Sequence, residues 1–430
     1  MLGGLTMPVA AILFFVTFGL LLALPRRRAY ISVISAGMFV ALGILPPMAA
    51  FYTINWNVLL MLAGIMGVVS LFIQSGMPAL LGDMVCARAP NVKWTIISLS
   101  LFGGLISAFA DNVATVLILA PVTLDICKKL DISPIKAIIA ISISVNLQGA
   151  ATMVGDTAAI LLSGQAGLNF LDFFFFMGRP GLFWVVQISA ITSTGVLVYF
   201  FRSHTQPTLK VEHTSKVDDY FPSYLLVGII LLLVAASLIP PEFNHPLMAG
   251  FICLGMFGVG MLRESLSGRG GRRIKTALQE LDLETLLLLG GLFVVVGGLT
   301  YTGAVELAST FFVGVGGDNI FIIFTMIVWI SVLFSAIVDN VPYVAAMLPV
   351  IAGIADILGI PPYLLYFGLL SGATLGGNIT PIGASSNLTA MGILRREGYT
   401  VNSLTFMKIS VPFTLTAVTT GYILIWLLWG

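Results

Sequence analysis

Residues 107–113 read Ser-Ala-Phe-Ala-Asp-Asn-Val, and residues 335–341 read Ser-Ala-Ile-Val-Asp-Asn-Val. The two stretches lie 228 positions apart (335 − 107), and the same offset matches further polar, proline and glycine positions without a gap. These matches are Pro121 with Pro349, Pro134 with Pro362, Gly149 with Gly377, Thr152 with Thr380, Gly155 with Gly383, and Gly164 with Gly392. Chance similarity between apolar segments would not align such residues, so we infer an internal duplication.

The composition is that of a membrane protein. Hydrophobic residues make up 58% of the chain and charged residues 9%, and the mean hydropathy is +1.05, whereas soluble domains carry roughly 25% charged residues. The 430 residues could form about ten crossings of ~20 residues each. The net charge of +1 and the lack of a basic block argue against a nucleic-acid partner. The three cysteines are widely spaced and predict neither a zinc site nor a disulfide framework.

Apolar runs divide the chain into two halves of six runs each. The runs begin near Met7, Tyr30, Val58, Ile97, Ile135 and Phe173, and again near Tyr224, Pro246, Leu286, Ile320, Tyr363 and Phe413. The most polar stretch lies between the halves. We therefore predict a first repeat at 1–201, a cytoplasmic linker at 202–222 and a second repeat at 223–430. We interpret the first apolar run as a membrane helix rather than a cleaved signal, because no basic segment precedes it.

The Lys and Arg distribution predicts the topology. If the N-terminus is outside and the segments around Asp111-Asn112 and Asp339-Asn340 are re-entrant hairpins, the chain makes ten crossings and its C-terminus is also outside. This arrangement leaves only Arg179 outside and puts the other Lys and Arg residues on the cytoplasmic side, as the positive-inside rule requires. Five crossings per half invert the second repeat. The predicted fold class is an all-α membrane protein of two inverted repeats, each with one broken helix and one re-entrant hairpin, which is typical of transporters.

Three acidic residues, Asp111, Asp156 and Asp339, lie deep in apolar segments. Each would cost at least ~2.5 kcal/mol at the bilayer centre unless it faces a partner or a cavity. We expect Asp111-Asn112 and Asp339-Asn340 to form the two hairpin tips and to hold a proton or a sodium ion. The alternative is that both aspartates only cap the returning helices. The two roles are compatible, since a capping carboxylate has a second oxygen.

Each hairpin is followed by a helix that the sequence interrupts, at residues 146–157 and 376–387. Clustered glycines and a proline free carbonyl groups for a cation and expose helix N-termini to an anion. The candidate binding residues in these stretches are Asn146, Asp156, Thr157, Asn378, Thr380, Ser385, Ser386 and Asn387. Two alternatives stay open: helices kinked for packing through small residues, and Asp156 as a capping residue. The repeat partner of Asp156 is Ala384, so this carboxylate belongs to the first half alone.

At these residues the sequence resembles the ion transporter superfamily, which contains arsenite permeases, NhaD-type sodium/proton antiporters, the P protein, citrate transporter-like proteins and divalent anion/sodium symporters. The motifs that carry the resemblance span residues 107–116, 338–342 and 375–387. The resemblance implies a dimerising scaffold domain and a mobile domain that works by an elevator-like movement. In the dicarboxylate symporters the tips read Ser-Asn-Thr; here Asn112 and Asn340 match, but an aspartate precedes each. Where arsenite and P-protein relatives show Gly-Asp-Pro-Pro-Asn, this chain departs after Gly155-Asp156.

The favoured hypothesis is a secondary active transporter driven by a proton or sodium gradient, without any other cofactor. Three buried carboxylates and no evident buried Lys or Arg favour an arsenite or sodium/proton antiporter, and a sodium-coupled di- or tricarboxylate symporter is the alternative. A passive channel is the second class. The absence of HExxH and GxSxG motifs from the apolar segments argues against an enzyme. We expect a homodimer in a prokaryotic inner membrane.

Overall fold

The computed structural model describes residues 3–207, 216–240, 243, 245–267 and 270–430. These residues are helical except for loops and one two-stranded hairpin, β1 (Phe175–Phe176) and β2 (Arg179–Pro180). The helices before residue 202 are α1 (Gly3–Ala23), η1 (Pro25–Arg27), α2 (Arg28–Ala41), α3 (Pro47–Thr53), α4 (Trp56–Gln74), α5 (Met77–Arg88), α6 (Val92–Ser107), α7 (Asn112–Lys129), α8 (Ile135–Gly149), α9 (Thr157–Ala166), η2 (Leu171–Phe173) and α10 (Leu182–Phe200).

The later helices repeat this order. They are α11 (Phe221–Ser237), α12 (Met248–Leu266), α13 (Gly270–Gln279), α14 (Leu283–Tyr301), α15 (Ala304–Gly316), α16 (Ile320–Ser335), α17 (Asn340–Leu358), α18 (Tyr363–Gly376), α19 (Ser385–Arg396) and α20 (Ser403–Trp429). Helices α4 to α10 thus recur in the same order as α14 to α20, although α20, with 27 residues, is longer than α10, with 19. The predicted linker joins the end of α10 to the start of α11, and its residues 208–215 lie outside the described residues.

Among the described residues, seven helices are long and apolar enough to cross a membrane, and an eighth span is possible if α15 and α16, bent by 118°, count as one. The predicted ten crossings and their orientation stay predictions. Helix α2 shows why the count is lower: its 14 residues extend only ~21 Å at 1.5 Å each, short of the ~30 Å hydrocarbon core. The run predicted near Phe173 begins later, at Leu182, because the β-hairpin precedes it.

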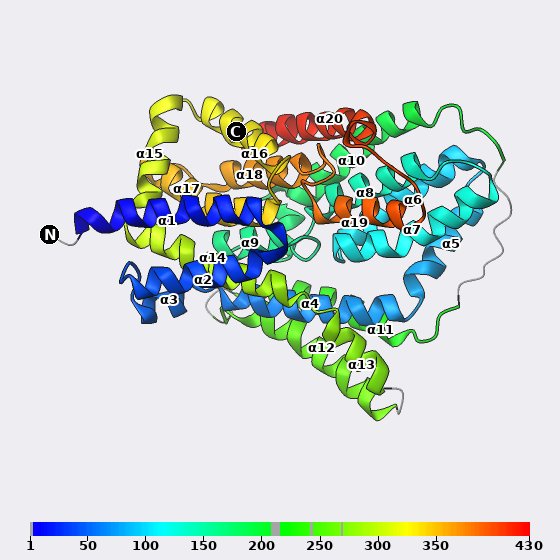
Figure 1. Ribbon diagram of the computed structural model, residues 1–430, viewed down its shortest axis with the longest axis horizontal. Helices are drawn as coiled ribbons and strands as arrows, with labels where there is room; N and C mark the ends of the chain where they lie inside the picture. The colour runs from blue at the N-terminus through cyan, green and yellow to red at the C-terminus, as the bar shows by residue number, and fades with distance from the viewer. Residues whose placement is uncertain (1–2, 208–215, 241–242, 244, 268–269) are drawn as a thin grey trace.

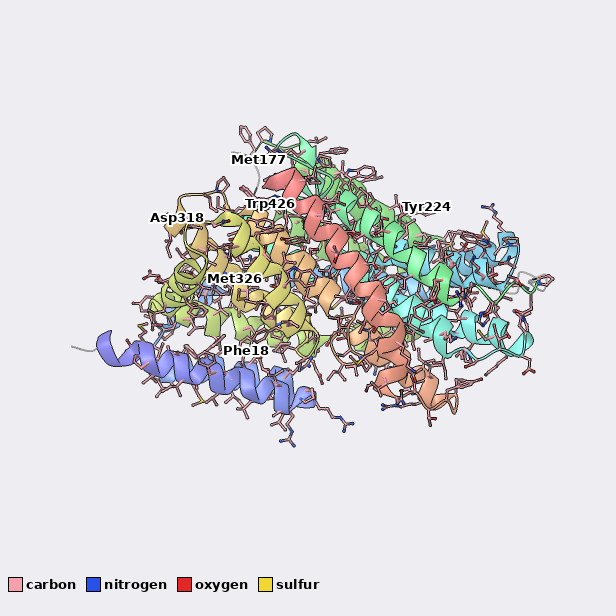
Figure 2. All side chains as sticks on the ribbon, turned by 90° about the horizontal axis from the view of Figure 1, so that it is seen from above. Phe18, Met177, Tyr224, Asp318, Met326 and Trp426 are labelled. Atoms are coloured by element: carbon pink, nitrogen blue, oxygen red, sulfur yellow. The ribbon has the colours of Figure 1, made fainter. Side chains whose placement is uncertain are left out.

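The two halves are interlocked. Helix α4 packs on α12, α2 packs on α14, and α10 packs on α20, so each pair joins an early helix to a late one. Figure 1 shows α5, α6 and α7 at one end of the molecule and α15 and α17 at the other. Figure 2 shows α1, with Phe18, along one edge, while α20, with Trp426, crosses the face turned to the viewer. The hydroxyls of Thr192 and Thr420, which are repeat partners, lie 3.1 Å apart where α10 meets α20.

In each of two helix–turn–helix pairs, an aspartate in the turn caps the second helix. Helix α6 ends at Ser107 and α7 begins after Asp111, whose carboxylate accepts a hydrogen bond of 2.9 Å from the amide of Ala114. Helix α16 ends at Ser335 and α17 begins after Asp339, which accepts one of 3.4 Å from the amide of Val341. Aspartate is favoured at this position because its carboxylate satisfies amides that the helix leaves unpaired.

The helix that follows each of these pairs is interrupted within the predicted stretch, between α8 and α9 in the first half and between α18 and α19 in the second. Each break packs directly on the preceding turn. A Cβ on Gly155 would lie 2.6 Å from the carbonyl oxygen of Ser107, and a Cβ on Gly383 would lie 2.6 Å from that of Ser335. The hydroxyls of Thr152 and Thr380 donate to the carbonyls of Ala108 and Ala336, again at matched positions. The duplicated glycines and threonines therefore fasten each break to its turn.

This packing predicts the effect of Gly383→Ala. The added methyl group would meet backbone oxygens that cannot move independently of the turn, and such overpacking costs roughly 1–3 kcal/mol. Thermal unfolding of the purified protein in detergent should show a clearly lower Tm. The control is Gly392→Ala on α19, where a Cβ meets nothing within 4 Å and where alanine is favoured over glycine in a helix. Equal Tm values for the two variants would contradict this explanation.

Candidate functional site

A cavity of about 230 Å³ lies where the turns and the breaks of both halves meet. It is smaller than the roughly 300–1,000 Å³ of pockets for drug-sized ligands, so it fits a small solute or ion. Its lining residues are Pro25, Arg28, Ala29, Met66, Asp111, Asn112, Val113, Asn146, Asp156, Thr157, Asp282, Glu284, Thr285, Leu288, Asp339, Asn340, Val341, Ala384, Ser385 and Ser386.

The structure brings most of the predicted site residues together. Nine of the twelve line this cavity: Asp111, Asn112, Asn146, Asp156, Thr157, Asp339, Asn340, Ser385 and Ser386. The other three, Asn378, Thr380 and Asn387, lie outside the lining. Residues distant in sequence thus form one site, and each half of the chain contributes a turn and a helix break.

Asn378, Thr380 and Asn387 have packing roles in this structure, and the hydroxyl of Thr380 bonds to the carbonyl of Ala336. The side-chain amide of Asn378 donates to the carbonyl of Ile143, at 2.9 Å, and its oxygen accepts from Asn146, at 3.1 Å. The oxygen of Asn387 accepts a hydrogen bond from the hydroxyl of Ser142 on α8. These fully buried bonds join α8 to the second break. They hold the cavity wall in place, because buried polar groups require partners.

Four helices begin at the cavity directly after a turn or a break, in addition to α2 and α14. These are α7, α9, α17 and α19, whose N-cap positions are Asp111, Asp156, Asp339 and Ala384. Helix N-termini carry partial positive charge and free amide donors, which attract anionic groups. Three of the four therefore receive a carboxylate from the chain itself.

The three buried aspartates differ in their partners. Asp111 caps α7, and Asp339 caps α17 through one oxygen, as the capping interpretation expects. The second oxygen of Asp339 accepts a 2.7 Å hydrogen bond from the guanidinium of Arg28. The side chain of Asp156 makes no capping bond. Its carboxylate accepts a hydrogen bond of 3.1 Å from the side-chain amide of Asn340, in the other half. The carboxylate unique to the first half thus contacts the second turn.

Arg28 corrects one expectation. We expected no Lys or Arg side chain at the site, but Arg28 lines the cavity and its side chain is only 25% exposed. The reason is the turn at Pro25–Arg27, which ends α1 and starts α2 beside Asp339. The signal in the sequence was an arginine cluster directly before an apolar run. No local pattern indicated a contact between residues 311 positions apart.

The start of α14 adds two acidic residues that the sequence analysis did not single out. Asp282 caps α14, accepting a 3.0 Å bond from the amide of Thr285, and Glu284 follows in the first turn. With the three aspartates above, they give the cavity five carboxyl groups and one guanidinium. In the described part of the chain no three His, Cys, Asp or Glu side chains lie close enough to hold a metal ion together. A cation at this site would therefore also need amide, hydroxyl or carbonyl oxygens.

The Arg28–Asp339 pair can be tested by a double-mutant cycle. Asp339→Asn keeps a capping oxygen, and Arg28→Gln removes the charge and shortens the side chain, so each variant should lose roughly 1–3 kcal/mol of stability at this partly buried pair. The double variant should be less destabilised than the sum, because the interaction is then lost only once. The measurement is thermal unfolding in detergent. The exposed pair Lys128–Glu397 is the control, and its coupling should be too small to resolve; strictly additive losses at Arg28 and Asp339 would contradict the pairing.

Known proteins resemble this chain over most of its length. A sequence profile described as Citrate transporter, the CitMHS family, matches residues 12–369. A protein of Mycobacterium tuberculosis described as an uncharacterized transporter is 32% identical, with 98% of each chain aligned. The mouse P protein is 26% identical over 86% of this chain and 54% of its own length.

Solved structures agree in fold. The YdaH transporter of Alcanivorax borkumensis superposes with a TM-score of 0.60 at 17% identity, covering 90% of this chain and 87% of its own. The Neisseria gonorrhoeae MtrF protein, described as one of a class of antimetabolite efflux pumps, gives 0.61 at 14% identity, with 90% and 84% covered. These identities show likeness of fold alone. The profile and the relatives show that this chain is a membrane-embedded secondary transporter, not an enzyme, and that it belongs to the citrate transporter family of the ion transporter superfamily.

Proposed function

We propose that the chain moves a small carboxylate anion of the di- or tricarboxylate type across the membrane, together with protons or sodium ions. The observation that carries this proposal is the joint presence, in one small cavity, of five carboxyl groups, one guanidinium and the N-termini of α7, α9, α17 and α19. Such a site offers acceptors to a cation and donors to an anion. Binding both together keeps the net charge in the membrane low, which lowers the cost of crossing.

The coupling ion is assigned to the acidic side of the cavity. Asp111 and Asn112 at the first turn, and Asp339 and Asn340 at the second, supply carboxylate and amide oxygens suited to a sodium ion. A proton could instead bind Asp156. Arg28 occupies one oxygen of Asp339, so a cation that binds there would have to displace the guanidinium. Displacement would free Arg28 to meet an anion.

Two observations favour a carboxylate over the antiporter that the sequence alone favoured. The argument against an anion was the lack of a cationic partner, and Arg28 supplies one. The matching family is also described as Citrate transporter. The excess of acidic groups still favours a second candidate, an arsenite or sodium/proton antiporter, because a cation or a neutral oxyacid would not be repelled by them.

For the mechanism we propose two inverted repeats and an elevator-like movement in a homodimer, in preference to a passive channel. Supporting observations are the recurrence of α4 to α10 as α14 to α20 and the identical packing of Gly155 and Gly383. The cavity is lined by the starts of α2 and α14 as well as by the turns and breaks. Movement of the turns and breaks past α2 and α14 would separate Arg28 from Asp339.

The experiment is transport by the purified protein in liposomes. Citrate, succinate, sulfate, arsenite and sodium are tested in turn under an imposed proton or sodium gradient, with empty liposomes as the background. We expect uptake of a carboxylate that depends on one of the gradients. Gradient-driven arsenite or sodium flux without carboxylate flux would favour the second candidate, and flux independent of either gradient would indicate a channel.

The carboxylates at the cavity are expected to be essential for coupling. Asp111→Asn, Asp156→Asn and Asp339→Asn should each lower gradient-driven flux at least ~100-fold, because the amide keeps the size but cannot carry the exchangeable charge. Size-exclusion chromatography checks that each variant folds. The matched control is Asp318→Asn, an exposed position between α15 and α16, which should transport like the wild type. Full activity in all three cavity variants would contradict the site assignment.

A further inference from the structure

The N-terminus of α19 differs from those of α7, α9 and α17. Asp111, Asp156 and Asp339 occupy the N-cap positions of α7, α9 and α17, but Ala384 occupies that of α19. Alanine has no side-chain acceptor, so the first amides of this helix receive no capping oxygen from it. At this one helix end the positive potential is not balanced by a carboxylate at the N-cap.

The difference is not imposed by backbone geometry. Asp156 has φ −140° and ψ 145°, and its repeat partner Ala384 has φ −142° and ψ 143°. An aspartate would therefore fit the backbone at position 384 as it does at position 156. The repeat partners two positions later differ in the opposite way. Position 158 is the apolar Ala158, two residues after Asp156, whereas position 386 is the polar Ser386, two residues after Ala384. Where the first half has a carboxylate and then a methyl group, the second half has a methyl group and then a hydroxyl.

Ser386 provides a second and independent observation. It lines the cavity, it is only 1% exposed, and its hydroxyl has no hydrogen-bond partner among the described residues. Buried hydroxyls without partners are uncommon because they lose hydrogen bonds to water. A ligand group that accepts a hydrogen bond would satisfy this hydroxyl.

We propose that the N-terminus of α19 and the hydroxyl of Ser386 bind one carboxylate or oxyanion group of the transported solute. The inference rests on the proposed function and assigns the anion to one end of one helix. A negative charge lies beside this position, because Asp339 accepts a 3.4 Å bond from the hydroxyl of Ser385. Arg28 pairs with Asp339 and offsets its charge. The anion thus binds at the N-terminus of α19, whose N-cap Ala384 carries no charge.

Two variants test the proposal in the liposome assay. Ser386→Ala removes one donor and should raise the KM for the carboxylate about tenfold with little change in kcat, as for one hydrogen bond to a charged group. Ala384→Asp adds the carboxylate that the other three helices already have and should lower carboxylate flux at least ~100-fold through repulsion. In the Ala384→Asp variant, stabilisation of the detergent-solubilised protein by sodium or by low pH should persist, since the coupling-ion residues are unchanged.

The control is Ser189→Ala on α10. It removes another fully buried hydroxyl that lacks a partner in the described structure, but it does so outside the cavity, and it should leave KM unchanged. A wild-type protein without gradient-driven flux of any solute would refute the proposed function and this inference together. Wild-type carboxylate flux with unchanged KM in Ser386→Ala would overturn the anion site alone. Flux of the neutral oxyacid arsenite without any anion would overturn both the anion site and the proposed carboxylate transport. If Ala384→Asp does not fold, the KM of Ser386→Ala decides.

Discussion

A charge at membrane depth must find a partner inside the protein, and the structure around the cavity follows from this constraint. The ion pair between Arg28 and Asp339 meets it most directly, since each group supplies the counter-charge of the other. Helix N-termini meet it for Asp111, which binds the free amide of Ala114. Asp156 instead accepts a hydrogen bond from the side-chain amide of Asn340 in the other half. The partner of Asp156 is available only because the turn of the second half meets the break of the first.

The sequence predicted this meeting point because duplication leaves a regular offset. Asp111 and Asp339 could be recognised as turns, and the stretches around Asp156 and Ser385 as helix breaks, from local glycine, proline and polar residues. The position of Arg28 could not be predicted, since it depends on how a short helix packs against a turn more than 300 residues later. Asn378 and Asn387 were predicted as binding residues, yet their side chains bond to α8 rather than line the cavity, because the direction of a side chain depends on the irregular backbone there.

The two halves share a framework but differ in chemistry. Glycine and threonine contacts fasten the breaks in the same way at both repeats. By contrast, a carboxylate stands at position 156 and a methyl group at its partner, position 384. Substitution of single side chains on a duplicated backbone can therefore divide one cavity into an acidic part and a part rich in donors. Such a division suits a transporter that couples an anion to a cation, because each ion then neutralises the other where solvation by water is poor.

The most direct measurement asks whether the cavity lies on the transport path. Ser385→Cys places a thiol at the cavity on an exposed position, while the native Cys86, Cys127 and Cys253 are buried. A charged, membrane-impermeant methanethiosulfonate reagent should modify this thiol and abolish flux in liposomes. The transported solute or the coupling ion should slow the modification, whereas Asp318→Cys should react without loss of flux. Complete modification at position 385 with unchanged flux would contradict the assignment of this cavity as the transport site.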